Sequence, residues 1–308
     1  MSSQRVRCSG GVCDTAEARA DAVSWVATAQ PAIVHRPRRR FGQNFLVDRS
    51  CVARIVQALD PRPEDLVVEI GPGRGAVTAP LLERVKVLHV VEIDRDLCAR
   101  LSVQYPRDRL VVHQGDALRF DFGTLGTGLR LVGNLPYNIS SPLLFHIARF
   151  APSVRDCHFM LQREVVDRMA AAPGSRSYGR LSVMLQYRFR VEKLFNVPAG
   201  AFRPTPKVDS AFVRLAPHAS LPVAARDEAQ LGELVAAAFS QRRKTVRNAL
   251  AAYADADQLS ELGIDPRLRP EDLSLADFVR LANAVGGRGA GSLPGGRVDD
   301  AKGAKPAA

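Results

Sequence analysis

The sequence predicts an α/β protein with a doubly wound, mostly parallel sheet, followed by a small all-helical domain. Two observations support this fold class. Short apolar runs typical of buried strands alternate with amphipathic helical segments through the middle of the chain, and repeated βα units form parallel sheets. From about residue 226 onward the helical segments follow one another with no strand between them. A sheet of this kind places the carboxyl ends of its strands at one edge, where ligands bind.

The individual elements follow from periodicity and boundary residues. Residues 48–60 place apolar side chains at i, i+3, i+4 and i+7, with Asp48 as N-cap and Pro61 as a stop, so we expect an amphipathic helix. Short apolar runs predict strands, whereas a 3.6-residue periodicity predicts helices. We expect Ser140 or Ser141 to cap the helix predicted over 140–150. The alternating run 208–215 predicts a late edge strand. The other predicted strands are 66–70, 86–93, 109–115, 129–134 and 157–162, and the other helices are 75–85, 94–105, 140–150, 163–171, 227–253 and 274–285.

These elements predict four parts of the chain. We expect a flexible extension over residues 1–35, an α/β domain over 36–218, a helical domain over 225–285 and a disordered tail over 286–308. The tail is rich in Gly, Pro and Ala. We assign no role to the extension or to the tail.

Composition narrows the class of protein. The net charge of +11 and the pI of about 9.9 suit a polyanionic partner such as nucleic acid, although a basic but unselective surface would look the same. The five cysteines include no C-x-x-C pair, which disfavours a disulfide framework or a zinc knuckle. No stretch approaches the roughly 20 apolar residues of a membrane span, and the N-terminus has no apolar signal core. We therefore expect a cytoplasmic protein with no membrane partner.

The first chemical signal is the glycine-rich run EIGPGRG, residues 69–75, between a strand and a helix. Glycines such as Gly71 allow a sharp turn and a close approach of the backbone to a ligand. Glu92 ends the next strand, where a carboxylate can accept hydrogen bonds from both hydroxyls of a ribose. Together they predict a nucleoside-containing cofactor. The alternatives are a plain tight turn at the glycines and, for Glu69, an ordinary polar strand end.

A second acid, Asp116, follows the third strand in HQGDAL. It can accept a hydrogen bond from the exocyclic amine of an adenine, or it can cap the turn that follows. The glycine loop, the ribose acid and this second acid would line one crevice outside the carboxyl ends of the strands. This set resembles that of class I S-adenosylmethionine-dependent methyltransferases, which implies a Rossmann-like fold and S-adenosyl-L-methionine as cofactor.

The run NLPY, residues 134–137, ends the fourth strand in the same crevice. The side-chain oxygen of Asn134 and the main-chain carbonyl of Leu135, freed by the turn at Pro136, can accept the two N6 hydrogens of an adenine. Tyr137 offers a ring face on which the base can stack, worth about 1–3 kcal/mol. Catalysis would then consist of positioning the amine and the methyl sulfonium in line, with no metal and no covalent nucleophile. The alternative is a proline-containing loop with a half-buried tyrosine.

Six segments stand out along the chain: RRRFGQNFL, EIGPGRG, GNLPYNISSPLLFHI, PGSRSYGRLSVMLQ, FRPTPKVDSAFVRL and RRKTVRNAL. Together, over about residues 36–285, they closely resemble the KsgA/RsmA family of small-subunit ribosomal RNA adenine-N6,N6-dimethyltransferases. Single motifs are shared with erythromycin-resistance methyltransferases and with mitochondrial transcription-factor relatives.

The resemblance implies roles for individual residues. Asn44 and Leu46 match cofactor contacts, as do Gly71, Glu92, Asp116 and Asn134. Tyr137 and Phe202 match aromatic positions that hold the flipped adenine, and the alternative for Phe202 is a simple core contact. The implied substrate is a pair of adjacent adenines in the 3′-terminal hairpin loop of 16S rRNA, within the small (30S) ribosomal subunit or its precursor. A target in a loop is easier to unstack than one in a duplex. We expect a monomer.

Two basic clusters are candidate phosphate contacts, with a solvated face as the alternative. They are Arg38, Arg39 and Arg40 before the first motif, and Arg242, Arg243, Lys244 and Arg247 on a predicted helix. Residues 174–179 are a candidate mobile loop near the substrate or a plain surface turn.

Two other functions remain open at this point. A related 23S rRNA adenine methyltransferase that confers macrolide resistance would use the same chemistry at another site. A non-catalytic RNA-binding or assembly factor could keep the fold without turnover, although the intact NLPY run and both acids disfavour this.

Overall fold

A seven-stranded mixed sheet forms the centre of the computed structural model, which describes residues 43–241 and 243–285. The strand order is β4-β3-β2-β5-β6-β9-β7. The first five strands of this order are parallel, and β9 pairs antiparallel with both β6 and β7. The strands are β2 (Val67–Ile70), β3 (Leu88–Glu92), β4 (Leu110–Gln114), β5 (Leu129–Asn134), β6 (Val154–Gln162), β7 (Phe189–Val197) and β9 (Ser210–Pro217).

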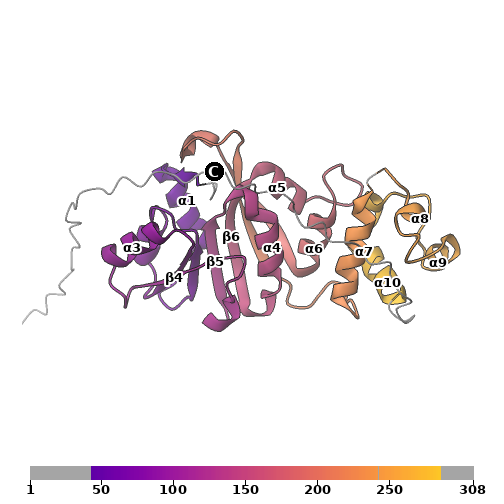
Figure 1. Cartoon of the computed structure of the whole chain (residues 1–308), viewed down its shortest axis with the longest axis horizontal. Coiled ribbons are helices and arrows are strands. Elements are labelled where there is room, and N and C mark those ends of the chain that lie inside the picture. The colour runs from indigo at the N-terminus through magenta and orange to yellow at the C-terminus, as the bar shows by residue number, and fades with distance from the viewer. Residues whose placement is uncertain (1–42, 242, 286–308) are drawn as a thin grey trace, which may run out of the picture. The chain divides into compact units, whose positions relative to one another are not determined.

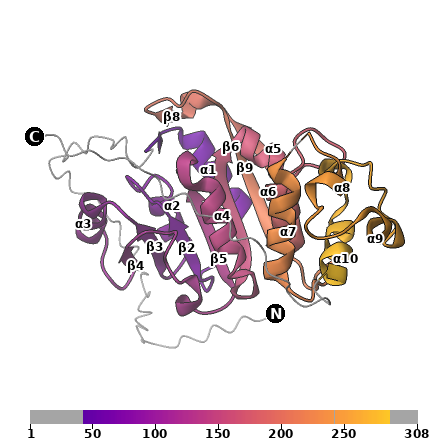
Figure 2. The ribbon, with the colours of Figure 1, turned by 45° about the vertical axis from the view of Figure 1, so that its right-hand side comes forward.

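Helices cover both faces of this sheet (Figures 1 and 2). One face packs against α1 (Arg49–Leu59), α2 (Thr78–Leu82) and α3 (Arg95–Gln104) through side chains such as Ile55, Leu81 and Leu101. The other face packs against α4 (Ser140–Ala148), α5 (Arg163–Met169) and α6 (Arg180–Arg188) through Leu144, Val166 and others. The predicted α/β class with a mostly parallel sheet is therefore confirmed.

The order in which strands are added to the sheet changes side at β2, and this switch places a crevice at the carboxyl end of β2. From β2 the chain runs outward through β3 to β4, and then crosses back to β5 on the other side of β2. Ligands bind at such switch points in doubly wound sheets. A separate two-stranded sheet of β1 (Phe45–Leu46) and β8 (Phe202–Arg203) lies outside the main sheet.

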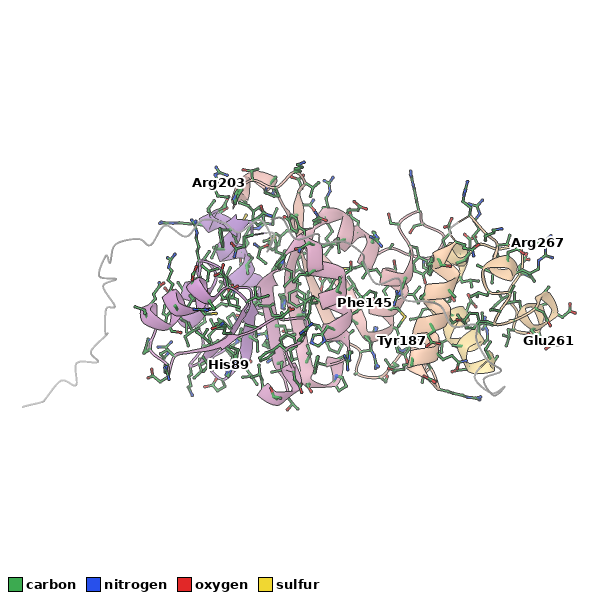
Figure 3. The ribbon with its side chains drawn as sticks, in the orientation of Figure 1. His89, Phe145, Tyr187, Arg203, Glu261 and Arg267 are labelled. Atoms are coloured by element: carbon green, nitrogen blue, oxygen red, sulfur yellow. The ribbon has the colours of Figure 1, made fainter. Side chains whose placement is uncertain are left out.

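Helices α7 (Glu228–Ser240), α8 (Val246–Ala249), α9 (Ala256–Glu261) and α10 (Leu275–Val285) follow with no strand between them, as predicted. They share a separate apolar core that also takes Tyr178, Val183 and Tyr187 from the α6 region. Tyr187 donates a hydrogen bond to Glu228 at the first turn of α7, 3.2 Å away, so it joins the helical segment to the α/β part (Figure 3). Residues 43–241 and 243–285 belong to one compact unit.

Buried charges fix α1 on the sheet at the end opposite the crevice. Arg130 on β5 binds both carboxylate oxygens of Asp156 at 2.8–2.9 Å and also contacts Asp65 at 2.8 Å. The same guanidinium donates to the carbonyl of Leu59, the last residue of α1. Because an unpaired charge in this setting costs several kcal/mol, the complete pairing is what makes the burial tolerable.

Three predicted features of the α/β part are wrong. The run 208–215 was expected at an edge, but β9 lies between β6 and β7, and β7 is the edge strand. The helix expected over 75–85 is only Thr78–Leu82, because the loop with glycines at positive φ extends to Gly75. The Ser140 side chain does not cap α4: it lies inside the first turn and donates to the carbonyl of Pro136 at 3.0 Å.

Other predicted features are confirmed. Asp48 caps α1 by accepting from the backbone of Ser50 and Cys51, and β5 has the predicted bounds. Within residues 43–241 and 243–285, no helix is long and apolar enough to cross a membrane. The predicted extension 1–35 and tail 286–308 lie outside the described residues.

Candidate active site

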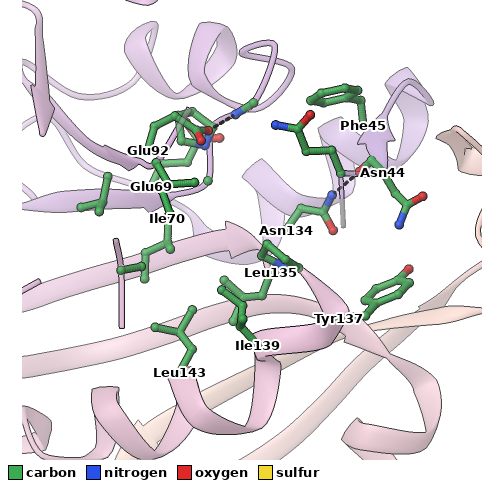
Figure 4. Close-up of a pocket in the computed structure, with 18 of the residues that line it drawn as sticks. Asn44, Phe45, Glu69, Ile70, Glu92, Asn134, Leu135, Tyr137, Ile139 and Leu143 are labelled. Carbon is green, nitrogen blue, oxygen red and sulfur yellow. Dashed lines mark hydrogen bonds between the residues drawn. The ribbon is translucent and has the colours of Figure 1, made fainter. Parts of the chain in front are cut away.

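A pocket lies at the carboxyl ends of β2, β3 and β5, where the switch point predicts a ligand (Figure 4). Its walls come from the segment around β1 and from the loops that follow four parallel strands. Nine of the predicted site residues line it, namely Asn44, Leu46, Gly71, Glu92, Asp116, Asn134, Leu135, Pro136 and Tyr137. Residues 90 positions apart in sequence therefore contribute to one cavity.

Two glycines make room where the pocket is built. Gly73 has φ +56°, and a Cβ atom there would approach the ring of Phe45 to 3.0 Å. Gly133, directly before the run NLPY (residues 134–137), would place a Cβ only 2.4 Å from the carbonyl oxygen of Ile70. A side chain at Gly133 would thus force β5 away from β2. These glycines let the loop after β2 and the end of β5 approach the same ligand.

The carboxylate of Glu92 is held at the end of β3 by backbone donors. Gly73 donates to Oε2 at 3.2 Å and Asp94 donates to Oε1 at 2.9 Å. The side chain is 6% exposed, and this burial raises the pKa of Glu92, whereas the two backbone donors act against the rise. The carboxylate faces the pocket beside the glycine loop (Figure 4). A role for this carboxylate in accepting hydrogen bonds from ribose hydroxyls stays a prediction.

Asp116 caps the turn that follows it, and its role toward an adenine amine stays a prediction. It lines the pocket after β4, and its Oδ1 also accepts a hydrogen bond from the backbone of Leu118 at 2.9 Å. One carboxylate oxygen therefore stabilises the turn, and Asp116 contributes to the pocket wall at the same position.

Asn134 has its side-chain amide oriented by the opposite wall of the pocket. Its Nδ2 donates to the main-chain carbonyl of Asn44 at 2.8 Å (Figure 4). This bond fixes the orientation of the amide, and Oδ1 is the acceptor that the side chain then presents. Leu135 donates its own N–H to Met160 at 3.1 Å, and among residues 43–241 and 243–285 nothing donates to its carbonyl. Two acceptors thus stand side by side at the end of β5.

Tyr137 opens a short 3₁₀ turn, residues Tyr137–Ile139, directly after Pro136. Its hydroxyl lies 2.6 Å from Oγ of Ser210, the first residue of β9. The ring lines the pocket and is half-buried, and burial raises the pKa of its phenol. A face of the ring is therefore available at the mouth of the pocket.

Phe202 is not brought to this pocket. Its side chain is fully buried in the core beneath α1, and its backbone pairs with Leu46 across the β1–β8 sheet. In this structure the ring occupies the core position that the sequence left as the alternative. A role for Phe202 against the target base stays a prediction.

Other residues line the pocket that were not predicted as site residues, among them Glu69, Ile93 and Phe45. Glu69 is buried, accepts a hydrogen bond from Oγ1 of Thr78 at 2.6 Å, and lies close to Glu92. Burial, helped by the charge of Glu92, raises the pKa of Glu69 to about 7. Ile93 lines the pocket, and 44% of its surface is exposed. The guanidinium of Arg74 lies over the ring of Phe45, and its Cζ lies 4.6 Å from the ring centroid. The sequence signal that could have identified Ile93 as a pocket residue is its position directly after the strand-end acid Glu92.

Comparison with known proteins shows the family of the chain. A model of the family described as ribosomal RNA adenine dimethylase matches residues 34–286.

The chain belongs to the ribosomal RNA adenine dimethylase family.

Curated relatives agree with this assignment to the dimethylases. The ribosomal RNA small subunit methyltransferase A of Laribacter hongkongensis is 60% identical over 257 residues, 83% of this chain and 98% of the relative. The protein of the same name from Aromatoleum aromaticum is 60% identical over 251 residues, 82% of this chain and 95% of the relative. The predicted enzyme class is therefore confirmed: this dimethylase is a methyltransferase that acts on adenine in ribosomal RNA.

Solved structures of two methyltransferases share the fold. A dimethyladenosine transferase from Plasmodium falciparum superposes with a TM-score of 0.68 at 26% identity, covering 79% of this chain and 98% of its own. The 23S rRNA methyltransferase ErmE superposes with a TM-score of 0.60 at 25% identity, covering 79% of this chain and 100% of its own. The methyltransferase fold predicted for this dimethylase is thus confirmed.

The basic clusters of the dimethylase are only partly described. Arg38, Arg39, Arg40 and Arg242 lie outside the described residues. Arg243, Lys244 and Arg247 are exposed, and none of them has an acidic partner within 43–241 and 243–285. The first two lie in the turn between α7 and α8, which corrects the single continuous helix that the sequence predicted. Contacts of these three cations with phosphates stay a prediction.

Proposed function

We propose that this chain transfers methyl groups from S-adenosyl-L-methionine to N6 of two adjacent adenines in the 3′-terminal hairpin loop of small-subunit (16S) rRNA. The product is N6,N6-dimethyladenine, formed during biogenesis of the small ribosomal subunit. The observation that carries the proposal is the orientation of Asn134, whose oxygen faces the pocket because its nitrogen is used by Asn44. The full-length match to curated relatives named for the small subunit favours that substrate.

The residues present fit the cofactor. Glu92 offers a carboxylate for the ribose, Asp116 offers a free oxygen for an adenine amine, and Ile93 offers an exposed apolar surface beside them. The glycine loop permits close approach of the backbone. When bound, S-adenosylmethionine supplies the methyl group that is transferred.

The chain's own residues would act on the adenine. Oδ1 of Asn134 and the carbonyl of Leu135 accept the two N6 hydrogens, which orients the amine and counteracts delocalisation of its lone pair into the ring. The ring of Tyr137 supports the base by stacking. No covalent intermediate with the protein is needed, so the contribution of the site is orientation of the two reacting groups.

The partners follow from the substrate. The small (30S) subunit or its precursor would be bound through the exposed cations of the helical segment, in the cytoplasm, by a monomer of the enzyme. The salt-sensitive contacts expected at phosphates would add affinity without sequence specificity.

The test is methyl transfer from labelled S-adenosylmethionine, with nucleosides analysed by mass. The substrates are small subunits from cells that lack the modification, large-subunit RNA and a DNA duplex, and the Asn134→Ala variant is the control for the site. We expect N6,N6-dimethyladenine in small-subunit RNA alone. Label in large-subunit RNA would replace the proposal with the resistance-type substrate. Cofactor binding with no label on any RNA would replace it with an assembly role.

A further inference from the structure

Ser210 is a buried polar residue that no role described so far explains. It is the first residue of β9, at the carboxyl end of the parallel strands, and its side chain is fully buried. Its backbone is paired on both sides, with Gln162 of β6 and Val197 of β7. The hydroxyl has one hydrogen-bond partner among the described residues, the hydroxyl of Tyr137 at 2.6 Å.

The position of Ser210 is well fixed by its surroundings. The carbonyl of the preceding residue, Asp209, accepts from the backbone of Arg163 at 3.0 Å. The carboxylate of Asp209 accepts from the backbone of Ala199 at 3.2 Å. A strand that is paired on both sides and held at its first residues is a rigid support for the hydroxyl of Ser210.

A hydrogen bond at the hydroxyl fixes the far end of the tyrosine ring. The near end is fixed by the Pro136 turn, since proline restricts the backbone just before Tyr137. With both ends held, the ring cannot swing away from the pocket. Without the bond at the hydroxyl, a half-buried ring at a pocket mouth can adopt other rotamers.

We propose that Ser210 is a positioning residue for methyl transfer, which holds the ring of Tyr137 where the target base stacks. This inference rests on the proposed function, because it takes the face of Tyr137 as the support for the adenine. Ser210 touches neither cofactor nor substrate and acts only through Tyr137. A parallel arrangement exists at Asn134, whose amide is held by the main chain of Asn44.

The chain offers a matched control for a buried serine. Ser182 in α6 is also fully buried, and it donates to the carbonyl of Arg168 and accepts from the backbone of Gly179 at 3.0 Å. Its hydroxyl does not line the pocket. Ser182→Ala therefore removes a buried hydroxyl of the same kind, with a cost in stability but no connection to Tyr137.

The experiment is a double-mutant cycle of Ser210→Ala and Tyr137→Phe, measured by steady-state kinetics on small subunits. We expect Ser210→Ala to lower kcat/KM for RNA by about five- to tenfold, as the loss of one positioned hydrogen bond would. The dissociation constant for S-adenosylmethionine should be unchanged. In the Tyr137→Phe background Ser210→Ala should have no further effect, because the bond is already absent. Ser210→Thr, which keeps a hydroxyl, should restore most of the activity.

Several outcomes would overturn the positioning role. They are wild-type kcat/KM in folded Ser210→Ala, additive effects in the cycle, or an equal loss in Ser182→Ala. If Ser210→Ala does not fold, Tyr137→Phe alone decides, since it removes the same bond and keeps the ring. Wild-type enzyme that labels only large-subunit RNA would overturn the proposed function, and the cycle would then be scored on that RNA.

Discussion

Nδ2 of Asn134 donates a hydrogen bond to the main-chain carbonyl of Asn44 at 2.8 Å, and this bond decides which atom of the amide faces the pocket. The two residues are 90 positions apart in the chain and come from opposite walls of the pocket. Because the donor is a side chain and the acceptor is backbone, the orientation does not depend on the identity of residue 44. The carboxamide of Asn134 is thus prepared as an acceptor before substrate arrives.

Replacing Asn134 by Ala should abolish most turnover without unfolding the protein. The variant loses an acceptor that is needed most while the amine is attacked, so we expect kcat to fall by about 100-fold or more, by analogy with removal of one preorganised hydrogen-bond group. Rates come from methyl transfer to small subunits, and folding from thermal denaturation. Asn196→Ala, an exposed asparagine on β7 outside the pocket, is the matched control. Wild-type rates in Asn134→Ala would refute the N6 assignment.

Replacing Glu92 by Gln should weaken binding of S-adenosylmethionine. The carboxylate is fixed by Gly73 and Asp94 and is placed to accept ribose hydroxyls, and a hydrogen bond to a charged group contributes roughly 1.5–3 kcal/mol. We therefore expect the dissociation constant to rise about 10- to 100-fold in calorimetric titration. Glu83→Gln, which removes an exposed carboxylate beside α2, should leave it unchanged. An unaltered affinity in Glu92→Gln would take Glu92 out of the ribose role.

Glu69 should make the stability of the protein fall as the pH rises toward neutrality. Burial raises the pKa of Glu69 from 4.5 to about 7, so between these values the folded state keeps a proton that the unfolded state has released. The contribution is fully present below pH 4.5, is lost progressively up to about pH 7, and amounts to about 3 kcal/mol in total. Denaturant unfolding at several pH values measures it.

The Glu69→Gln variant isolates this effect. It keeps an oxygen that can accept from Thr78 but does not titrate, so the free energy of unfolding should depend less on pH between 5 and 7 than in the wild type. Identical pH profiles for the two proteins would mean that Glu69 is ionised in the folded state throughout this range.

Local sequence signals predicted the elements that depend on local chemistry. The apolar run Leu129–Val132 followed by Asn-Leu-Pro gave the bounds of β5, and Asp48 gave the start of α1, because strand ends and caps are set by neighbouring residues. The acid and glycine positions of the pocket followed for the same reason, since each comes directly after an apolar strand.

Features that depend on distant contacts could not be predicted in this way. The alternation in 208–215 was interpreted as an edge strand, but Arg214 is a polar residue of a central strand, where it lies 4.0 Å from the buried Asp156. Phe202 pairs with Leu46, a residue far away in the sequence, and no local pattern predicts this pairing. The bond from Tyr137 to Ser210 joins residues 73 positions apart, and no local pattern marks it.

Removing the two exposed arginines near α8 should weaken binding of the small subunit and reduce its salt dependence. Arg243 and Arg247 have no acidic partner among the described residues, so each is available for a phosphate. Each lost phosphate contact lowers the slope of log K against log salt by roughly 0.7–0.9, so Arg243→Ala with Arg247→Ala should lower it by about 1.5. Binding is measured at several salt concentrations.

The matched control changes the net charge equally within the same helical segment. Arg267 and Arg280 pair with Asp265 and Asp277, and Arg267 projects from the surface (Figure 3). Arg267→Ala with Arg280→Ala should leave the salt slope close to that of the wild type, because cations already paired with carboxylates release fewer counterions from RNA. Equal effects of the two double variants would mean that net charge alone acts. No effect of Arg243→Ala with Arg247→Ala would place the docking surface elsewhere on the enzyme.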